Sequence, residues 1–351
     1  MSELLNDFCI AQPPLIKPRE LLQAMPCSVG STSFIKAARA ATTNIIQGRD
    51  QRLLVIVGPC SIHDENITLE YAELLSNAAL QFADELLIVM RVYFEKPRTL
   101  LGWKGLISDP WLDESFDINH GLQLARKILL QLAKRGVPAA TEFLDNIIPQ
   151  YLQDLITWSA IGARTAESQL HRELASGLAM PVGFKNTTAG NVQVAVDAVN
   201  AARHSHCFLG ISTTGEVAVT RTPGNNAGHI VLRGSHDAVN YTNVDIKKAV
   251  NALADAGLTQ RLMVDCSHGN SMRDFQQQPK VISALVEQLQ EGATSILGVM
   301  LESNLVAGKQ QVNANKPLVY GQSITDACLS WRETLPLLEQ LALGVKHRGS
   351  G

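Results

Sequence analysis

The sequence lacks the features that mark secreted, membrane-spanning or nucleic-acid-binding proteins. Its six cysteines form no C-x-x-C pair, and no basic, apolar leader opens the 351-residue chain. No apolar run approaches the roughly 18 residues of a membrane-spanning helix. The formal net charge of −3 provides no general attraction for nucleic acid. We therefore expect a reduced, cytoplasmic protein without a membrane span and without a nucleic-acid partner.

Most of the chain alternates between short apolar runs and helical patterns. With 46% hydrophobic and 18% charged residues, it can bury a large core. Eight strand-like runs start near residues 53, 86, 139, 160, 181, 229, 262 and 295. Eight strand–helix units predict an α/β fold, and specifically a (β/α)8 TIM barrel. A doubly wound open sheet is the alternative, but no G-x-G-x-x-G follows the first strand.

Two segments do not fit this repeat. Prolines interrupt the first half of residues 1–50, and the second half predicts a helix over residues 33–47. We expect this arm to pack on the barrel or on another subunit. Residues 207–222 alternate with a period of two around a Thr-Gly turn, which predicts an inserted β-hairpin. The domain prediction is an arm over residues 1–50 and a barrel over residues 51–351 that carries the hairpin.

Basic side chains stand at or just after the carboxyl ends of the predicted strands. They are Arg91, Lys96, Arg98, Arg164, Lys185 and Arg233. In a barrel these ends lie on one face, so the cations converge and imply polyanionic ligands, most simply two phosphorylated or carboxylated molecules. For the K-P-R segment alone, a solvated basic turn is the simpler interpretation. Glu142 and Asp265 also end strands, and we assign them supporting roles because such a pocket needs counter-charges.

A second set of residues has metal-ligand chemistry. Cys60, His268 and Glu302 follow three different strands, and Asp326 precedes the last predicted helix. One thiolate, one imidazole and two carboxylates suit a first-row divalent ion, but they do not distinguish manganese, iron, cobalt and zinc. Each residue alone has a simpler explanation: a buried cysteine, a structural histidine, a loop carboxylate, and for Asp326 in S-I-T-D a helix cap. The metal prediction depends on their convergence in the barrel.

Longer motifs identify a family. They are LLVIVGPCSIHD, MRVYFEKPRT, GWKGLISDP, SAIGART, PVGFKN, DCSHGNS and YGQSITDAC. Between about residues 50 and 345 the chain resembles the type I (short, metal-dependent) 3-deoxy-D-arabino-heptulosonate 7-phosphate (DAHP) synthases regulated by aromatic amino acids. The resemblance implies the barrel and a transferase that condenses phosphoenolpyruvate, D-erythrose 4-phosphate and water to DAHP and phosphate. This is the first step of the shikimate pathway, which leads to chorismate and the aromatic amino acids.

The resemblance also implies roles for single residues. The divalent metal would be held by Cys60, His268, Glu302 and Asp326. Phosphoenolpyruvate would be bound by Arg91, Lys96, Arg164, Lys185 and Arg233, with Glu142 beside them. Arg98 and Thr99 would bind the phosphate of the sugar. The catalytic residues would be Lys96, the candidate for proton transfer to the new alkoxide, and the ligands Cys60 and His268, of which His268 is less suited to proton transfer while it binds metal.

Several positions depart from the family pattern. The usual K-N-G-T-D-G is K-N-T-T-A-G, so Thr187 and Ala189 replace Gly and Asp. Ala166 replaces the second Thr of T-T-E-S, and Leu100 replaces the second Thr of R-T-T. A Cβ at Thr187 would restrict the turn after the substrate lysine. These differences bear on substrate affinity rather than on the reaction.

Regulation and assembly follow from the same resemblance. Family members carry an amino-terminal arm and a hairpin insert that build an inhibitor site, and residues 1–50 and 207–222 are the candidates here. We therefore expect inhibition by an aromatic amino acid and a homodimer or homotetramer. The segments D-C-S-H-G-N-S and E-S-N favour tyrosine as the effector.

Two other functions remain open at this point. A sister synthase that uses arabinose 5-phosphate shares the barrel and its cations, although K-P-R-T, the arm and the hairpin argue against it. A non-catalytic metabolite sensor could also keep the pocket, but all four predicted metal ligands are retained.

Overall fold

The computed structural model describes residues 13–98, 102–313 and 316–348, and in them eight parallel strands close into a ring. The strands are β1 (Leu53–Gly58), β2 (Leu86–Arg91), β3 (Ala139–Glu142), β4 (Trp158–Ile161), β5 (Val182–Lys185), β8 (Gly228–Leu232), β9 (Leu262–Asp265) and β10 (Ile296–Asn304). The ring closes where β1 pairs with β10, with Gly58 opposite Glu302. The (β/α)8 barrel prediction is confirmed. The fourth strand starts at Trp158 rather than near residue 160.

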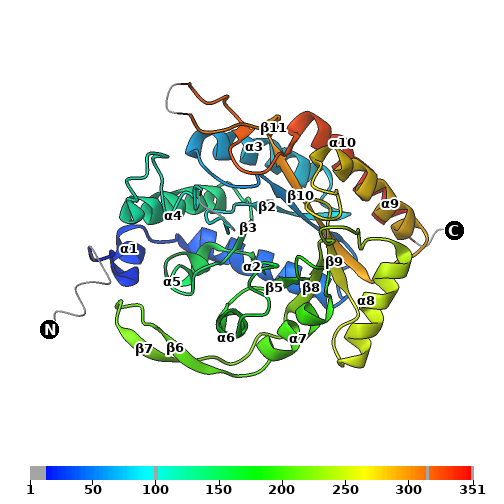
Figure 1. Cartoon of the computed structure of the whole chain (residues 1–351), viewed down its shortest axis with the longest axis horizontal. Coiled ribbons are helices and arrows are strands. Elements are labelled where there is room, and N and C mark those ends of the chain that lie inside the picture. The colour runs from blue at the N-terminus through cyan, green and yellow to red at the C-terminus, as the bar shows by residue number, and fades with distance from the viewer. Residues whose placement is uncertain (1–12, 99–101, 314–315, 349–351) are drawn as a thin grey trace.

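Helices surround the strand ring (Figure 1). They are α3 (Glu65–Gln81), α4 (Ile118–Lys134), α5 (Pro149–Leu152), α6 (Gln169–Gly177), α7 (Gln193–Ala202), α8 (Asn243–Asp255), α9 (Gln278–Gln290) and α10 (Trp331–Lys346). The helix expected over residues 149–157 is only one α-turn followed by a 3-10 turn. The last helix starts after Ser330, whose side chain and that of Glu333 form a capping box. The alternative role of Asp326 as a helix cap is therefore wrong.

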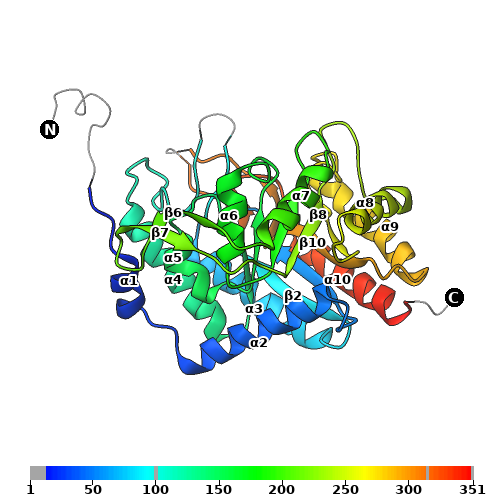
Figure 2. The same ribbon diagram turned by 90° about the horizontal axis from the view of Figure 1, so that it is seen from below.

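Helix α2 (Val29–Ile46) closes the amino end of the barrel. Figure 2 shows it running across the side opposite the upper loops. Its last residues, Ile45 and Ile46, are buried among inward-facing strand residues such as Trp158 and Met263. Fully burying one such side chain contributes about 1.5–3 kcal/mol. The described part of the arm thus packs on the barrel, and α2 completes its inner core.

The predicted hairpin is present and lies beside the arm. Strands β6 (Cys207–Ile211) and β7 (Val217–Arg221) pair antiparallel on the outside of the barrel (Figure 1). The hairpin turn accepts a hydrogen bond from the amide of Arg19 in α1 (Pro18–Ala24), with 2.8 Å from Arg19 N to Thr213 O. The two segments that sequence analysis separated from the barrel therefore contact each other.

Three short strands connect β10 to α10: β11 (Val306–Lys309), β12 (Gln322–Ser323) and β13 (Leu329–Ser330). The sequence did not predict them. β13 extends the sheet beside β10, with Ser303 opposite Leu329, and this keeps the intervening residues at the carboxyl end of the barrel.

In the part of the chain that the structure describes, no helix has the length and apolar character to cross a membrane.

Candidate active site

A cavity of about 320 Å³ opens at the carboxyl ends of the strands. The basic and acidic side chains that line it are Arg91, Lys96, Arg98, Glu142, Arg164, Lys185, Arg233, His268 and Asp326. The structure thus gathers the six predicted cations around one space. Thr99, the remaining predicted substrate residue, lies outside the described residues. A second cavity of about 380 Å³ lies between α8 and α9 and is lined by none of the predicted site residues.

Three of the four predicted metal ligands form a compact group. Ligand atoms of Cys60, Glu302 and Asp326 all lie within 4.8 Å of one another. Cys60 Sγ is 3.5 Å from Asp326 Oδ2. Burial, followed by the negative charge of Glu302, raises the pKa of the Cys60 thiol to about 11. A divalent cation between these donors would offset that repulsion and favour the thiolate, so the residues fit a metal.

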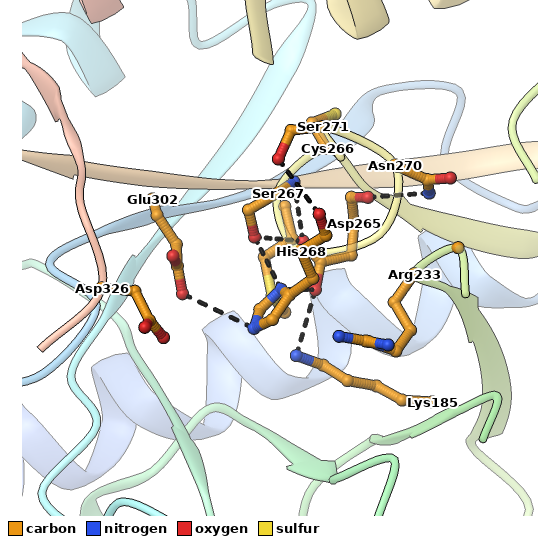
Figure 3. Close-up of polar contacts among 12 residues, drawn as sticks. Lys185, Arg233, Asp265, Cys266, Ser267, His268, Asn270, Ser271, Glu302 and Asp326 are labelled. Carbon is orange, nitrogen blue, oxygen red and sulfur yellow. Dashed lines mark hydrogen bonds and ion pairs between the residues drawn. The ribbon is translucent and has the colours of Figure 1, made fainter. Parts of the chain in front are cut away.

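His268 lies at the edge of this group. Its Nε2 is 3.9 Å from Glu302 Oε1, and Figure 3 shows the imidazole between Glu302 and Lys185. The other ring nitrogen, Nδ1, lies 2.7 Å from Ser267 Oγ and 2.9 Å from Asp265 Oδ2. These contacts fix the ring and leave Nε2 directed at the carboxylate cluster. A histidine oriented by a carboxylate in this way is the usual arrangement of a metal ligand.

Arg91 is buried with only 1% exposure and is already paired. Its Nη2 donates to Glu302 Oε1 at 2.9 Å, and its guanidinium stacks 3.6 Å from the centre of the Tyr93 ring. Burial favours loss of the Arg91 proton, but Tyr93 and Glu302 outweigh this effect and raise its pKa. Arg91 therefore stays charged and links the cation set to the metal-ligand set. Sequence reasoning missed Tyr93 as a site residue, although it stands inside the quoted motif MRVYFEKPRT.

Lys185 forms a second buried ion pair at the base of the cavity. Its Nζ lies 3.1 Å from Asp265 Oδ2. Burial alone would raise the pKa of Asp265, but Lys185 and His268 hold it well below its ordinary value. Asp265 therefore carries the negative charge that orients both neighbours, in line with the supporting role expected for it. The carboxylate of Glu142, the other expected counter-charge, lies against Gly162. A Cβ atom added to Gly162 would be 2.2 Å from Glu142 Oε1.

Three asparagines tie together the loops that carry these residues. Asn186 accepts from the Arg233 amide at 2.8 Å and from Asn240 Nδ2 at 3.1 Å. Asn270 accepts from the Asn240 amide at 2.8 Å and donates to the carbonyl of Asp265 at 2.9 Å. The carboxyl ends of β5, β8 and β9 are thereby joined. These residues were missed as site residues, although Asn186 and Asn270 stand inside quoted motifs.

The sequence of the chain matches a known family model over most of its length. Residues 29–339 match the model described as the DAHP synthetase I family. The chain belongs to the DAHP synthetase I family. The family resemblance drawn from the motifs is therefore confirmed, and the protein is an enzyme of this family.

Individual relatives of this DAHP synthetase I family member support the same family assignment. The Phe-sensitive phospho-2-dehydro-3-deoxyheptonate aldolase of Escherichia coli K12 is 51% identical over 334 residues, covering 95% of each chain. The Tyr-sensitive enzyme of the same strain is 51% identical over 342 residues, covering 97% of this chain and 96% of its own. A solved phospho-2-dehydro-3-deoxyheptonate aldolase from Francisella tularensis SCHU S4 superposes with a TM-score of 0.95 at 49% identity, over 97% of this chain and 99% of the other.

The structure shows the surroundings of two residues that depart from the family pattern, Thr187 and Ala166. Thr187 is nearly buried, and its Oγ1 accepts from the Asn191 amide at 3.0 Å, so the added side chain helps to close the turn. The positive φ of this turn falls on Gly190 rather than on Thr187, which removes the expected restriction. Ala166 is completely buried. Leu100 lies outside the described residues.

Proposed function

We propose that this protein is a DAHP synthase that condenses phosphoenolpyruvate with D-erythrose 4-phosphate and releases inorganic phosphate. The observation that carries the proposal is that six cations line one cavity of about 320 Å³ together with His268 and Asp326, and that Asp326 also belongs to a cysteine–carboxylate cluster with Cys60 and Glu302. Two anionic substrates repel each other in water, and fixed cations around one space can align them. Relatives about 50% identical bear the name of this activity.

The substrate positions that we propose follow the family resemblance of the motifs. We assign phosphoenolpyruvate to Arg91, Lys96, Arg164, Lys185 and Arg233, and the sugar phosphate to Arg98 and Thr99. Glu142 would orient neighbouring cations. The metal ligands would be Cys60, His268, Glu302 and Asp326, and their mixed sulfur, nitrogen and oxygen donors leave manganese, iron, cobalt and zinc open.

Bond formation joins C3 of phosphoenolpyruvate to the aldehyde carbon of the sugar phosphate. A bound divalent metal would supply the Lewis acidity that polarises this aldehyde. Lys96 would deliver its proton to the new alkoxide oxygen. Burial favours the neutral form of Lys96, but Cys60 and Glu302 outweigh it and raise the pKa, so the proton is present to be given. Water then adds at C2, and the resulting hemiketal phosphate collapses to the ketone and free phosphate.

A phosphate-release assay tests this function. Purified protein would be assayed with both substrates, then after chelation and after addition of Mn²⁺ or Zn²⁺. We expect release only when both substrates and a metal are present. A parallel reaction with arabinose 5-phosphate distinguishes the sister synthase, and no release with either sugar would instead favour the metabolite sensor.

Feedback inhibition by an aromatic amino acid is part of the proposal. A cavity of about 130 Å³ lies between the hairpin and the ends of α5 and α6, and its lining includes Pro149, Leu178, Phe208 and Arg221. Apolar walls suit an aromatic ring, and Arg221 suits a carboxylate. The relatives are named Phe-, Tyr- and Trp-sensitive at 49–51% identity, so the choice of tyrosine stays a prediction. Unchanged rates with millimolar amounts of each of the three amino acids would contradict this part.

We also propose a homodimer or homotetramer in the cytoplasm. The hairpin presents an exposed apolar face in which Leu209 and Val219 stand opposite each other, with Val217 beside them. An apolar strand face of this kind suits contact with a second subunit. The five cysteines among the described residues are all free, which suits a reducing compartment. Light scattering of the purified protein measures the assembly.

A further inference from the structure

Gln278, the first residue of α9, is completely buried against the backbone of Glu302. Gln278 Nε2 donates to the Glu302 carbonyl at 3.0 Å, and its Oε1 accepts from the Glu302 amide at 2.9 Å. The amide side chain therefore holds both backbone groups of one residue. We propose that Gln278 is a positioning residue for the Glu302 carboxylate, an inference that rests on the proposed metal site.

The barrel needs this contact because β9 ends before β10 does. The last pair between these strands is Met300 with Asp265, and the Cys266 amide donates to the Met300 carbonyl at 2.8 Å. Hydrogen-bonding groups on one edge of a strand recur at every second residue, so the next ones are the amide and carbonyl of Glu302. Gln278 supplies the donor and the acceptor that β9 no longer offers. Its side chain continues the strand ladder by one step.

The position of the Glu302 backbone matters because its carboxylate has several neighbours. Glu302 Oε1 lies 2.9 Å from Arg91 Nη2 and 3.9 Å from His268 Nε2. It also belongs to the group whose ligand atoms lie within 4.8 Å of one another. Metal–ligand distances tolerate only about 0.2 Å of variation. A displaced strand end would therefore weaken metal binding without removing any ligand.

A primary amide is suited to this position because it both donates and accepts. Leucine at residue 278 has a similar size but leaves a buried N–H and a buried carbonyl without partners. Asparagine keeps the amide and is one methylene shorter, so it cannot reach both groups equally. Gln288 offers a matched control on the same helix: it is also buried, and its Nε2 donates to the Tyr241 carbonyl at 3.0 Å, away from the metal-ligand group.

The experiment compares the wild type with Gln278→Leu, Gln278→Asn and Gln288→Leu. Each full-length protein is stripped of metal and titrated with Mn²⁺, with the free ion measured by electron paramagnetic resonance. Hydrogen–deuterium exchange of residues 300–304 is recorded in the metal-free state. We expect Gln278→Leu to weaken Mn²⁺ binding about 10–100-fold and to speed exchange at Glu302, with a smaller effect for Gln278→Asn. Gln288→Leu should keep the wild-type affinity and exchange.

Three outcomes would overturn the proposal. One is a folded Gln278→Leu protein with wild-type Mn²⁺ affinity and exchange. Another is an equal loss of affinity in Gln288→Leu, which would indicate a general effect of a damaged helix. The third is rapid exchange of the Glu302 amide in the wild type. If Gln278→Leu does not fold, the Mn²⁺ affinity and the exchange of Gln278→Asn decide instead. If the wild type binds no Mn²⁺, the proposed metal site fails, whereas the exchange measurement still tests whether Gln278 holds the strand end.

Discussion

The deep wall and the rim of the cavity hold their cations in different ways. The deep wall consists of Arg91, Lys96 and Lys185, which are all buried. The rim consists of Arg98 and Arg164, which are both exposed. Both groups line the same space, so a bound anion would meet both.

Each cation of the deep wall has a partner within the protein. Arg91 lies 2.9 Å from Glu302, and Lys185 lies 3.1 Å from Asp265. Lys96 Nζ lies 3.1 Å from Cys60 Sγ. Such partners offset the cost of burying charge and fix each side chain before a ligand arrives.

Neither rim cation has such a partner in residues 13–98, 102–313 and 316–348. Among the residues that the structure describes, no salt bridge joins Arg98 or Arg164 to a carboxylate. Arg98 uses its Nε to donate to the Trp103 carbonyl at 2.8 Å, and none of the described residues accepts a hydrogen bond from its two terminal nitrogens. The comparison indicates that the deep cations are held by the fold itself, whereas the proposed function leaves the rim cations to bind ligands.

Replacing Arg91 should have the largest effect. Arg91→Ala leaves Glu302 as a buried charge without its partner, and breaking a buried ion pair of this kind costs about 3–5 kcal/mol of unfolding free energy. Chemical denaturation monitored by circular dichroism measures the loss. Arg98→Ala is the matched rim variant and should stay within about 0.5 kcal/mol of the wild type. Equal stability of the two variants would remove the distinction between deep wall and rim.

Replacing Cys60 tests the proposed metal site, which adjoins the deep wall through the contact between Cys60 and Lys96. We expect Cys60→Ser to lower kcat/KM about 10²–10³-fold, since it removes the soft ligand from the site that would stabilise charge in the transition state. Metal content after purification should fall in parallel, and His268→Ala should behave in the same way. Cys207→Ser, in the exposed hairpin, is the control. Wild-type metal content and rate in Cys60→Ser would contradict the ligand assignment.

The sequence predicted those parts of the site that follow from strand ends. Arg91, Lys185 and Cys60 each stand at or just after the carboxyl end of an apolar run, and barrel topology then requires them to share a face. The hairpin was equally visible, because period-two alternation around a turn is a local pattern. These features combine a short-range signal with one global rule.

Other parts of the site depend on contacts that no local pattern encodes. The Tyr93 ring stacks against the Arg91 guanidinium, and Gln278 forms hydrogen bonds with Glu302, which is 24 positions away in the sequence. Asp326 shows the converse error, because S-I-T-D resembles a cap locally while Ser330 caps the helix. In each case packing decides among locally equivalent options, and the sequence alone does not describe that packing.

His229 differs from the deep-wall cations, because it is a buried base that forms no ion pair with any described residue. Its Nε2 accepts from Trp158 Nε1 at 3.2 Å inside the barrel, and burial lowers its pKa to about 4 from an ordinary 6.5. As pH falls below about 6.5, the unfolded chain binds a proton that the folded state refuses. The folded state should therefore lose up to about 3 kcal/mol between pH 6.5 and 4 through this residue.

Denaturation curves at pH 8 and pH 4.5 measure this loss in the wild type and in His229→Gln. Glutamine can offer an oxygen to Trp158 but does not titrate. We expect the variant to lose less stability on acidification than the wild type. Identical pH dependence would show that the buried imidazole does not control acid stability.

The smallest expected effect concerns the rim alone. If Arg98 serves only the sugar phosphate, Arg98→Ala removes charge-assisted hydrogen bonds and should raise the KM for erythrose 4-phosphate about 10–100-fold, with stability and the KM for phosphoenolpyruvate unchanged. Arg164→Ala should show the reverse pattern, because Arg164 is assigned to phosphoenolpyruvate. Steady-state kinetics with each substrate varied in turn separate the two. If either variant raises both KM values equally, the rim binds the substrates as a shared field of charge, and the two arginines have no separate assignments.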